Sequence, residues 1–508
     1  MKKLFKVLAS RATHFPEQDA LISNDGRTQT MINNQQLLDH IFTVGNFFEK
    51  EAVKCIGLFM DNCAQWIICD LAAAKLGITL VPIPLFFSQS QVDHLVVSAG
   101  IEAILTQPLM VDILKSNQSL AIENSKKTEA VLPLENTVML RIALKKRAKM
   151  SAKEAVDLTK SIKVTYTSGS TGEPKGVCLS AQSIGAVCEG IAASMSAMAT
   201  TNHLCVLPLA TLLENIAGVY VCLLHGGVVI TEPLAALGFL SNAKFDISKL
   251  LAKIDLYQAG SIILLPQMLT LLVHGFNGTV LKQCSSLQFI AVGGGKSSKP
   301  ILQQANILGL PVFEGYGLSE CGSVASLNLP SQQRIGSVGK ALPHIDVVIS
   351  EEGEIVIEGQ AMLGYLGELD QAVDRIYTGD LGYIDEDGYI FVSGRKNNKI
   401  VSSFGRNISP EWVEASLSSS AVISQIAVFG EARPSLSAVI VSPLNDTEEI
   451  NKAIEECNKH LPDYAQIRHW LSAEQPFTPN NNLLTNNGRL KRLNIEKFYQ
   501  QQLAALYA

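Results

Sequence analysis

The sequence has 508 residues, of which 47% are apolar and only 17% are charged, and its mean hydropathy is +0.20. At about 100–200 residues per domain this length predicts two to four units, and the low charge predicts a large buried core, which excludes a disordered chain. The 41 Lys and Arg residues face 47 acidic residues, the net charge is −6 and no basic block occurs, so nucleic-acid binding is not expected.

The positive hydropathy does not predict a membrane protein. The apolar runs Ile216–Leu224 and Gly226–Ile230 are shorter than the roughly 18–20 residues that a spanning helix needs. The N-terminus begins like a signal peptide, but Lys6 splits its apolar part, so an amphipathic first helix is predicted. The ten cysteines lie mostly in apolar runs without a CxxC pair, which predicts buried thiols in a reducing compartment and no zinc site. We therefore expect a cytoplasmic protein without a membrane span.

Short apolar runs alternate with helix-length segments over the first 315 or so residues. Cys55–Met60 and Thr79–Pro84 are strand-like, whereas Cys63–Leu76 and Gln91–Ala99 have helical spacing. Continuously apolar runs are typical of strands that are covered on both faces, as in βαβ units with parallel sheets. The later strand-like runs are Lys163–Thr167, His203–Leu209, Val228–Thr231, Ser261–Pro266 and Leu287–Val292.

The pattern changes after Gly317 and again near Gly394. Strand-like segments separated by Glu352-Gly353 and Asp387-Gly388 turn signals predict a small β-rich unit. An α/β fold is therefore expected, with a large domain of stacked parallel sheets at 1–394 and a small α+β domain at 395–508, joined by a polar linker at 394–399. The remaining predicted strands are Asp346–Ile349, Glu354–Glu358, Tyr389–Ser393, Gln425–Phe429 and Ala438–Val441, and the predicted helices are Pro410–Ser418, Glu448–His460 and Asn494–Leu506.

The segment Thr167–Gly176 follows a strand-like run and is dense in glycine, hydroxyl groups and one lysine. Glycine allows tight turns that present backbone N–H groups, and hydroxyls and a point charge beside them suit a polyphosphate. It is not a Walker loop, because Pro174 precedes Lys175 and Gly176 follows it. A flexible Ser/Gly loop is the alternative interpretation. A second cluster, Gly293–Ser297, also fails as a Walker loop and is a moderate sign of close backbone approach to a ligand.

The segment Thr167–Gly176 resembles the phosphate loop of the adenylate-forming superfamily, which contains acyl- and aryl-CoA synthetases, non-ribosomal peptide adenylation domains and luciferases. Further boxes of that superfamily follow in order. Glu314–Glu320 resembles its YGxTE box and Tyr377–Asp380 its TGD box. Gly394–Lys396 and Gly405–Pro410 resemble its hinge and the loop that follows. The resemblance covers nearly the whole chain.

Within the superfamily, the sequence looks most like fatty acyl-CoA synthetases, on Leu207–Leu209 with Glu214 and on the GYGLSE spelling at 315–320. The resemblance implies a two-step reaction with ATP and Mg²⁺. A carboxylate attacks the α-phosphorus to give an acyl-adenylate and pyrophosphate, and a thiol, usually coenzyme A, then displaces AMP. Because the first step brings two anions together, it needs backbone N–H groups, a cation and cationic side chains.

The resemblance also implies a role for individual residues. Lys175 would hold phosphates, Tyr316 would lie against the adenine and Glu320 would bind Mg²⁺, since a carboxylate oxygen suits a hard cation. Asp380 and Arg395 would contact the ribose, and Ser319 the α-phosphate. Taken singly, such residues are more often a core tyrosine, a solvated glutamate and a turn aspartate. The full set of expected nucleotide contacts is Thr167, Ser168, Gly169, Ser170, Thr171, Gly172, Lys175, Gly294, Glu314, Gly315, Tyr316, Gly317, Ser319, Asp380 and Arg395.

The resemblance implies that the tunnel for the acid is lined by Leu209–Ile216 and Ala291–Gly295. We call this lining the acyl wall. Its small and aliphatic residues favour a fatty or other apolar acid over an amino acid, although Glu214 leaves this open. Thr211 occupies the position at which fatty acyl-CoA synthetases often have a histidine. The wall residues are Ala210, Leu213, Ala217, Gly218, Gly294 and Gly315.

The C-terminal segment Leu484–Arg492 departs from the resemblance. The family box has a lysine that bridges the acyl carboxylate and the α-phosphate, and here Arg489 occupies that position. The lysine delivers charge without transferring a proton, so arginine can replace it in part, although the two are not interchangeable. Either Arg489 acts with Glu320 and Lys175 as a catalytic residue, which we favour, or adenylation is impaired and the chain is a nucleotide- or acyl-binding protein.

A domain rotation is implied as well, because one small domain serves two half-reactions. The resemblance places the hinge at Asn397, a residue type that tolerates unusual backbone angles. An ordinary polar linker would occupy the same place. The accepting thiol stays open between coenzyme A and the phosphopantetheine of an acyl carrier protein, because Gly394–Pro410 shows nothing that decides between them.

Overall fold

The computed structural model describes most of the chain. The described residues are 1–24, 26, 28–116, 129–131, 134–142, 161–168, 174–195, 202–240, 245–275, 278–359, 361–368, 373–403, 406–418, 420–444, 446–485 and 488–507. Gly169, Ser170, Thr171 and Gly172 of the expected phosphate loop, and Gly405 of the expected hinge loop, therefore lie outside the described residues.

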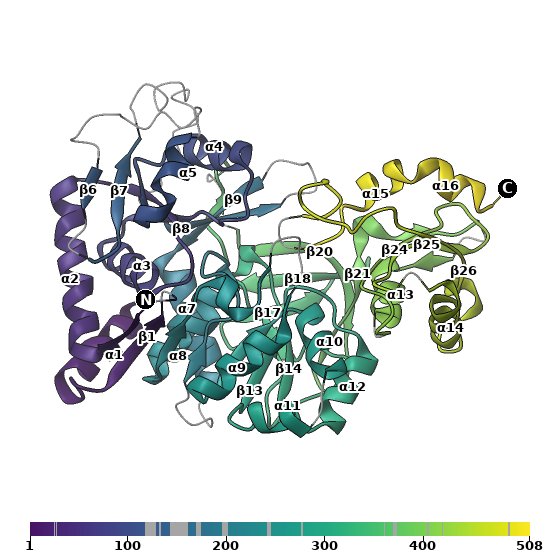
Figure 1. Cartoon of the computed structure of the whole chain (residues 1–508), viewed down its shortest axis with the longest axis horizontal. Helices are drawn as coiled ribbons and strands as arrows, with labels where there is room; N and C mark the ends of the chain where they lie inside the picture. Colours follow the sequence, from purple (N-terminus) through teal and green to yellow (C-terminus); the bar gives the residue numbers. More distant parts are fainter. Residues whose placement is uncertain are drawn as a thin grey trace.

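A nine-stranded sheet forms one half of the large N-terminal part (Figure 1). Its order is β16-β15-β14-β13-β12-β10-β11-β1-β2, with a parallel centre from β14 to β1 and antiparallel edges. The strands are β1 (Asp19–Asn24), β2 (Gln29–Asn33), β10 (His203–Leu204), β11 (Val229–Thr231), β12 (Ser261–Leu264), β13 (Phe289–Val292), β14 (Val312–Tyr316), β15 (Ser326–Leu327) and β16 (Lys340–Ala341).

An eight-stranded sheet in the order β19-β9-β8-β4-β3-β5-β7-β6 forms the other half. Its central strands β8, β4, β3 and β5 are parallel, and its remaining pairs are antiparallel. The predicted stacked parallel sheets are therefore mixed sheets, because hairpins such as β8–β9 add antiparallel strands at their edges. The strands are β3 (Cys55–Phe59), β4 (Thr79–Pro82), β5 (Ala103–Thr106), β6 (Glu129–Val131), β7 (Val138–Arg141), β8 (Ser161–Ser168), β9 (Pro174–Ser180) and β19 (Gly364–Tyr365).

Helix α3 (Ala64–Leu76) lies between the two large sheets and contacts strands of both. Nearly all of its side chains are buried, as a helix that is apolar all round requires. The first helix, α1 (Lys2–His14), buries Leu4, Leu8 and Ala12 on one face, as predicted. The other helices of this part are α2 (Asn34–Glu51), α4 (Gln89–Ser98), α5 (Val111–Ser116), α7 (Ala181–Ser194), the π-helix η3 (Glu214–Tyr220), α8 (Val221–His225), α9 (Ile247–Tyr257), α10 (Pro266–His274), α11 (Gly278–Gln283) and α12 (Lys299–Ile307), with short 3₁₀ turns η1 (Pro108–Met110), η4 (Leu234–Leu237) and η5 (Ser319–Cys321).

The predicted β-rich unit is an antiparallel sheet in the order β17-β18-β20-β21. Its hairpins turn at Gly353 and Gly388, whose positive φ values of 79° and 82° suit glycine. In this sheet Asp380 of β20 stands opposite Arg395 of β21, which brings the TGD-like box beside the first residues of the hinge. The strands are β17 (Ile345–Ile349), β18 (Glu354–Gly359), β20 (Arg375–Ile384) and β21 (Ile390–Arg395).

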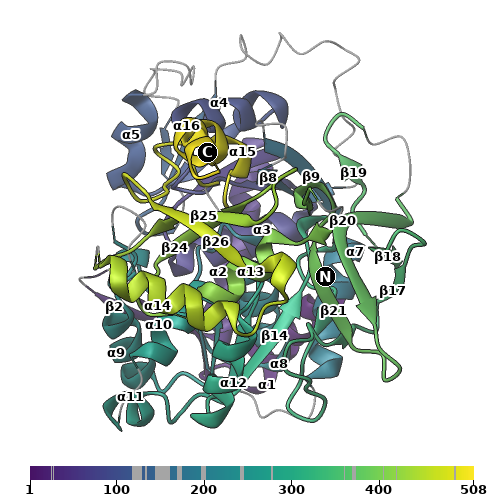
Figure 2. The same ribbon diagram turned by 90° about the vertical axis from the view of Figure 1, so that its right-hand side faces the viewer.

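The C-terminal residues form a separate lobe beside the large part, with its own core of apolar side chains (Figures 1 and 2). The predicted helix Asn494–Leu506 is two helices, α15 and α16. They break at Tyr499, whose buried hydroxyl accepts a hydrogen bond from Glu474 N at 3.0 Å. The elements are η6 (Lys396–Asn398), β22 (Ile400–Val401), β23 (Asn407–Ile408), α13 (Pro410–Leu417), β24 (Gln425–Phe429), β25 (Leu436–Val441), α14 (Thr447–Asn458), η7 (Asp463–Ala465), β26 (Ile467–Ser472), α15 (Arg492–Phe498) and α16 (Gln500–Ala505).

The predicted strands and helices are largely confirmed, with the predicted strand His203–Leu209 reduced to β10 and the linker partly occupied by the end of β21 and by η6. All ten cysteines are described, none forms a disulfide and nine are buried, as expected. None of the helices in the described part of the chain combines the length and hydropathy that a membrane crossing requires.

A buried ion pair joins α15 and β24 of the C-terminal lobe to α13. Arg492 NH1 and NH2 lie 2.6 and 3.0 Å from the carboxylate oxygens of Glu414, and NH1 also donates to Val428 O at 2.8 Å. Glu414 in turn accepts from Val428 N at 2.7 Å. Both side chains are largely withdrawn from solvent.

We expect Arg492→Met to lower the free energy of unfolding by about 3–5 kcal/mol, because Glu414 is left as an unpaired buried charge. Urea unfolding followed by tryptophan fluorescence measures the change. The double variant Arg492→Met/Glu414→Leu removes both charges and is expected to recover most of the loss. A double variant that is no more stable than the single one would contradict the assignment.

Candidate active site

The site begins at an ion pair between neighbouring strands. Asp380 of β20 is buried, and its two carboxylate oxygens accept from Arg395 Nε at 2.8 Å and from the Tyr316 hydroxyl at 2.7 Å. Arg395 NH1 also donates to Thr378 O at 3.1 Å. Burial raises the pKa of Asp380, and Arg395 and Tyr316 oppose this effect. The sequence analysis placed these three residues together around the ribose and adenine, and the structure brings them into direct contact.

Glu320 lies on the short turn η5 and is connected to Lys175 through one aromatic side chain. The Tyr365 hydroxyl donates to Glu320 Oε1 at 2.9 Å, and Lys175 Nζ lies 5.1 Å from the centroid of the Tyr365 ring. Tyr365 belongs to β19, which pairs with β9 beside Lys175. Tyr365 was missed in the sequence analysis, because a tyrosine in the Gly364–Tyr365 segment carries no motif of its own.

The hairpin β8–β9 supports the expected phosphate loop. Thr167 pairs with Lys175 and Ser168 with Pro174, so the last described residues on each side stand opposite one another. His94 Nε2 lies 3.1 Å from Pro174 O and anchors the start of β9 to α4. The loop itself, 169–173, lies outside the described residues, and its role stays a prediction.

The second glycine cluster follows β13 and lies beside the end of β14. Ser297 N donates to Glu314 Oε1 at 3.1 Å, and burial raises the pKa of Glu314 to about 7. A Cβ atom at Gly293 would stand 3.6 Å from Gly315 O and 3.7 Å from Leu213 Cδ2, so these backbones pass closely. The ends of adjacent parallel strands meet here, where open α/β sheets bind ligands.

Gly317 and Gly294 are required as glycine for two different reasons. A Cβ atom at Gly317 would come within 2.1 Å of Ser323 O, which leaves no space for a side chain. Gly294 has a φ of 82°, a value that side chains disfavour. Ser319, the expected α-phosphate contact, begins η5 and is half-buried.

Arg489 faces this same region from the C-terminal lobe. Its loop is held by Arg489 N donating to Thr485 Oγ1 at 3.0 Å and by Thr485 N donating to Arg489 O at 2.7 Å. The side chain keeps access to solvent, yet protein surrounds it enough that desolvation lowers its pKa. Asp380 and Glu320 act on its charge in the opposite direction, so Arg489 lies within electrostatic range of both carboxylates.

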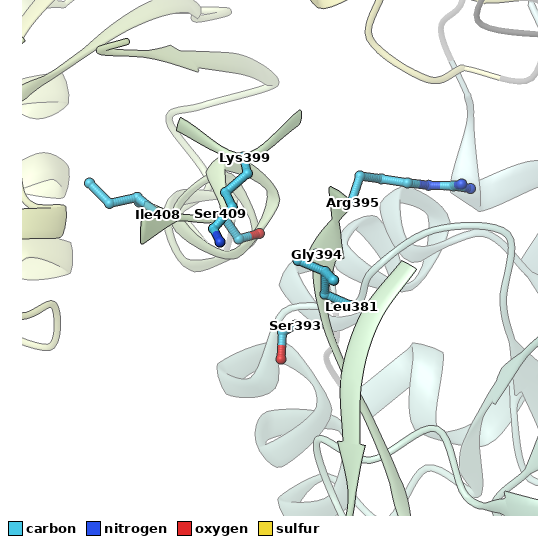
Figure 3. Close-up of a pocket in the computed structure, with 7 residues that line it drawn as sticks. All are labelled: Leu381, Ser393, Gly394, Arg395, Lys399, Ile408 and Ser409. Carbon is cyan, nitrogen blue, oxygen red and sulfur yellow. The ribbon is translucent and has the colours of Figure 1, made fainter. Parts of the chain in front are cut away.

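A pocket lies between the large part and the C-terminal lobe (Figure 3). Leu381, Ser393 and Gly394 line one side, Lys399, Ile408 and Ser409 line the other, and Arg395 extends away from Ile408 and Ser409. A Cβ atom at Gly394 would lie 2.1 Å from Ser409 Oγ. Gly394 therefore lets the C-terminal lobe approach the large part closely. Asn398 fixes the linker, because its Nδ2 donates to Glu411 Oε1 at 2.6 Å.

These residues fit ATP and a hard divalent cation. Among the described residues Tyr365 donates to one oxygen of Glu320, and a carboxylate oxygen is a ligand of the kind Mg²⁺ prefers. Lys175, Arg395 and Arg489 supply three cationic side chains from separate parts of the chain around the same region. The arrangement suits stabilisation of phosphate charge.

The wall residues expected to face the acid lie on or near η3. Leu213 and Ala217 are partly buried and pack against the cores of both halves. Glu214 is fully buried, accepts from Leu207 N at 2.8 Å and lies 2.7 Å from His203 Nε2. The sequence left open whether Glu214 could hold an ammonium group of the substrate, and both of its oxygens are engaged inside the protein.

Comparison with known proteins agrees with this fold. The AMP-binding enzyme family matches residues 8–369, and the AMP-binding enzyme C-terminal domain matches residues 397–508. The o-succinylbenzoate CoA synthetase of Bacillus subtilis in complex with its acyl-adenylate intermediate superposes with a TM-score of 0.75 at 22% identity, over 96% of this chain and 97% of that one. The expected α/β architecture of this class of enzymes is thus confirmed.

Two curated relatives differ in the acid they are named for. A 2-succinylbenzoate–CoA ligase of Bacillus pumilus is 26% identical over 90% of this chain and 91% of its own. A long-chain-fatty-acid–CoA ligase, FadD15 of Mycobacterium bovis, is 28% identical over 39% of this chain and 38% of its own. The chain belongs to the AMP-binding enzyme family, and it is an ATP-dependent, AMP-forming acid–thiol ligase.

If Arg489 delivers positive charge to the reacting phosphate, as the sequence predicts, we expect Arg489→Lys to keep substantial adenylation and Arg489→Ala to lose about 100-fold or more of it. Pyrophosphate release in the presence of ATP and acid measures this. Lys491→Ala, two residues away in the same loop, is the matched control and should change little. Unchanged pyrophosphate release in Arg489→Ala would refute a catalytic role.

We also expect the stability of the folded chain to depend on pH through Glu314. Its pKa is raised from 4.5 to about 7 in the folded state, so folding favours the protonated form, and the contribution is present below pH 4.5 and lost as pH rises through 7. Between pH 5.5 and 8 the loss is about 2 kcal/mol. Urea unfolding of wild type and Glu314→Gln at both values measures it. An equal pH dependence in the two proteins would contradict the assignment.

Proposed function

We propose that this enzyme joins a carboxylic acid with an apolar body, such as a fatty acid, to coenzyme A through an acyl-adenylate. The observation that carries the choice of acid is the character of the wall near η3. The described wall residues Ala210, Leu213, Ala217 and Gly218 are aliphatic or small. Lys163 and His203, which contact η3, are both paired with carboxylates inside the protein. No described basic group of this wall is left to pair with a charged substrate tail.

The first step is the attack of the acid's carboxylate oxygen on the α-phosphorus of ATP, with cleavage of the bond to pyrophosphate. Lys175 and the β8–β9 hairpin that carries it would hold the leaving phosphates. Asp380 and Arg395 would orient the ribose. Arg489 would lie between the two anions and offset their repulsion. Mg²⁺ held at Glu320 would supply further positive charge to the phosphates.

The position of Arg489 favours an enzyme that carries out adenylation over the alternative, a binding protein that has lost adenylation. The guanidinium lies within range of Asp380 and Glu320, where the charge is needed, and the pair of Thr485 hydrogen bonds holds its loop in that place. A protein that had lost adenylation would not need a cation near Asp380 and Glu320. The seating of the C-terminal lobe in the structure is thus suited to the first step.

The second step is attack of the thiol sulfur on the acyl carbonyl, which releases AMP. We assign the acceptor as coenzyme A, following the names of the relatives, with a carrier-protein phosphopantetheine as the alternative. We further propose a division at 394/395, where Gly394 packs against Ser409 and a lobe rotation about Asn397 would move Arg489 out for the thiol. Ten cysteines without a disulfide favour a reducing cytoplasm.

A second candidate acid is 2-succinylbenzoate. It is favoured by a relative named for this acid that spans about nine-tenths of both chains. The two candidates differ in chemistry, since 2-succinylbenzoate carries a second carboxylate and a fatty acid does not. An acid with two carboxylates needs a cationic partner at the far end of the pocket.

The test is incubation of the protein with ATP, Mg²⁺ and a panel of acids, with and without coenzyme A, followed by mass spectrometry of the products. The panel contains fatty acids of increasing length, benzoate and 2-succinylbenzoate. We expect acyl-CoA from fatty acids in preference to 2-succinylbenzoate. Acyl-adenylate that coenzyme A does not consume would favour the carrier protein, a preference for 2-succinylbenzoate would overturn the fatty-acid assignment, and no product would favour the binding protein.

A further inference from the structure

A buried ion pair lies in the core of the large part, away from the nucleotide residues. Lys163 of β8 and Asp70 of α3 are each 1% exposed, and Lys163 Nζ lies 2.8 Å from Asp70 Oδ1. Such a pair costs desolvation energy that its attraction barely repays unless further hydrogen bonds complete it. Here both partners are completed by the same short segment, the π-helix η3.

Asn215 and Tyr220 are the two residues of η3 that meet this ion pair. Asp70 Oδ2 accepts from Asn215 Nδ2 at 2.8 Å and from the Tyr220 hydroxyl at 2.6 Å. Lys163 Nζ donates to Asn215 Oδ1 and, at 3.2 Å, to the Tyr220 hydroxyl. The four side chains therefore form one closed network, with each partner of η3 bound to both charges.

The spacing of these two residues matches a π-helix and not an α-helix. Five residues apart, they would point about 140° from one another around an α-helix of 3.6 residues per turn. The wider turn of a π-helix, with its i to i+5 hydrogen bonds, brings them to the same face. The ion pair therefore favours the π register of this segment. In an α-helical register either Asn215 or Tyr220 would point away from the ion pair.

A second polar pair packs on η3 through Gly218. A Cβ atom at Gly218 would lie 2.4 Å from Glu214 Oε1 and 2.5 Å from His203 Nε2. The His203–Glu214 pair therefore leaves no space for a side chain at position 218. Glu214, at the start of η3, also accepts a hydrogen bond from Leu207 N. The π-helix is a rare and costly helical form, and here buried polar contacts hold both ends of η3.

The register of η3 matters for the acid because the expected wall residues are carried by it. Leu213 precedes η3 and Ala217 lies within it, and both pack between the cores of the two halves. A Cβ atom at Gly293 would lie 3.7 Å from Leu213 Cδ2 and 3.6 Å from Gly315 O, so Leu213 lies near these two glycines. A change from π to α register would rotate Ala217 relative to Leu213 and reshape this wall.

We propose that Lys163 and Asp70 are positioning residues that hold η3 in its π register and thereby set the shape of the acyl wall and the selectivity for the acid. The proposal rests on the proposed function, because it takes the wall at η3 to contact the acid. The two residues act through Asn215 and Tyr220 and do not touch the substrate. They couple the strand that leads into the phosphate loop to the helix beside the acid.

Two double variants separate positioning from mere stability. Lys163→Met/Asp70→Asn removes both charges but keeps an oxygen that accepts from Tyr220, whereas Lys163→Met/Asp70→Leu removes the charges and the acceptor. Pyrophosphate release over the fatty acid series measures acid selectivity, with KM for ATP as the internal control. We expect the Asn variant to change acid selectivity less than the Leu variant, because one acceptor for Tyr220 remains. In the Leu variant we expect KM for the preferred acid to rise about tenfold or more and the preferred length to shift, with KM for ATP unchanged.

Hydrogen exchange of the backbone amides of η3 reports the register without any substrate. Faster exchange confined to 214–220, larger in the Leu variant than in the Asn variant, supports the proposal. Exchange and acid selectivity that equal those of the wild type in both variants would overturn it. If the wild type converts no acid, the proposed function fails, while the exchange data still decide the register. Should the Leu variant not fold, Tyr220→Phe, which removes one hydrogen bond to Asp70, is measured in the same way.

Discussion

The contact of Asp380 with Arg395 and Tyr316 joins the three main parts of this molecule. Tyr316 ends a strand of the nine-stranded sheet, Asp380 lies in the four-stranded sheet, and Arg395 ends the last strand of that sheet, directly before η6. Burial raises the pKa of Asp380, and Arg395 and Tyr316 oppose this effect. The placement of the lobe that carries Arg489 follows from this junction, since the linker begins where Arg395 is held.

Few charges are available in a chain with 17% charged residues, and several of them are paired inside the protein. Lys163 with Asp70 and Arg492 with Glu414 are buried ion pairs that hold elements in place. Lys175, Glu320 and Arg489 differ, because each keeps access to the region where ATP and an acid would meet. We propose that the paired charges position elements of the fold and that the accessible charges take part in the reaction.

Much of the fold could be predicted because its signals are local. Continuous apolar runs predicted β3, β4 and β24 closely, and the boxes at 167–176, 314–320 and 377–380 predicted where a nucleotide would be held. The predicted parallel sheets were only partly right, since edge strands join through hairpins that carry no long apolar run. The strand expected over His203–Leu209 is short, because Leu207 and Leu209 bond to Glu214 and Asn62 in place of a neighbouring strand.

The sequence by itself determined the class of enzyme, the order of its nucleotide boxes and the exchange of a lysine for Arg489, since each depends on residue types at short spacing. The tertiary structure decided that Tyr365 links Lys175 to Glu320 and that Lys163 meets Asp70 and the π-helix. The reason is physical. Partners that lie 45 residues or more apart come together only when the strands and helices pack, and no local pattern records that distance.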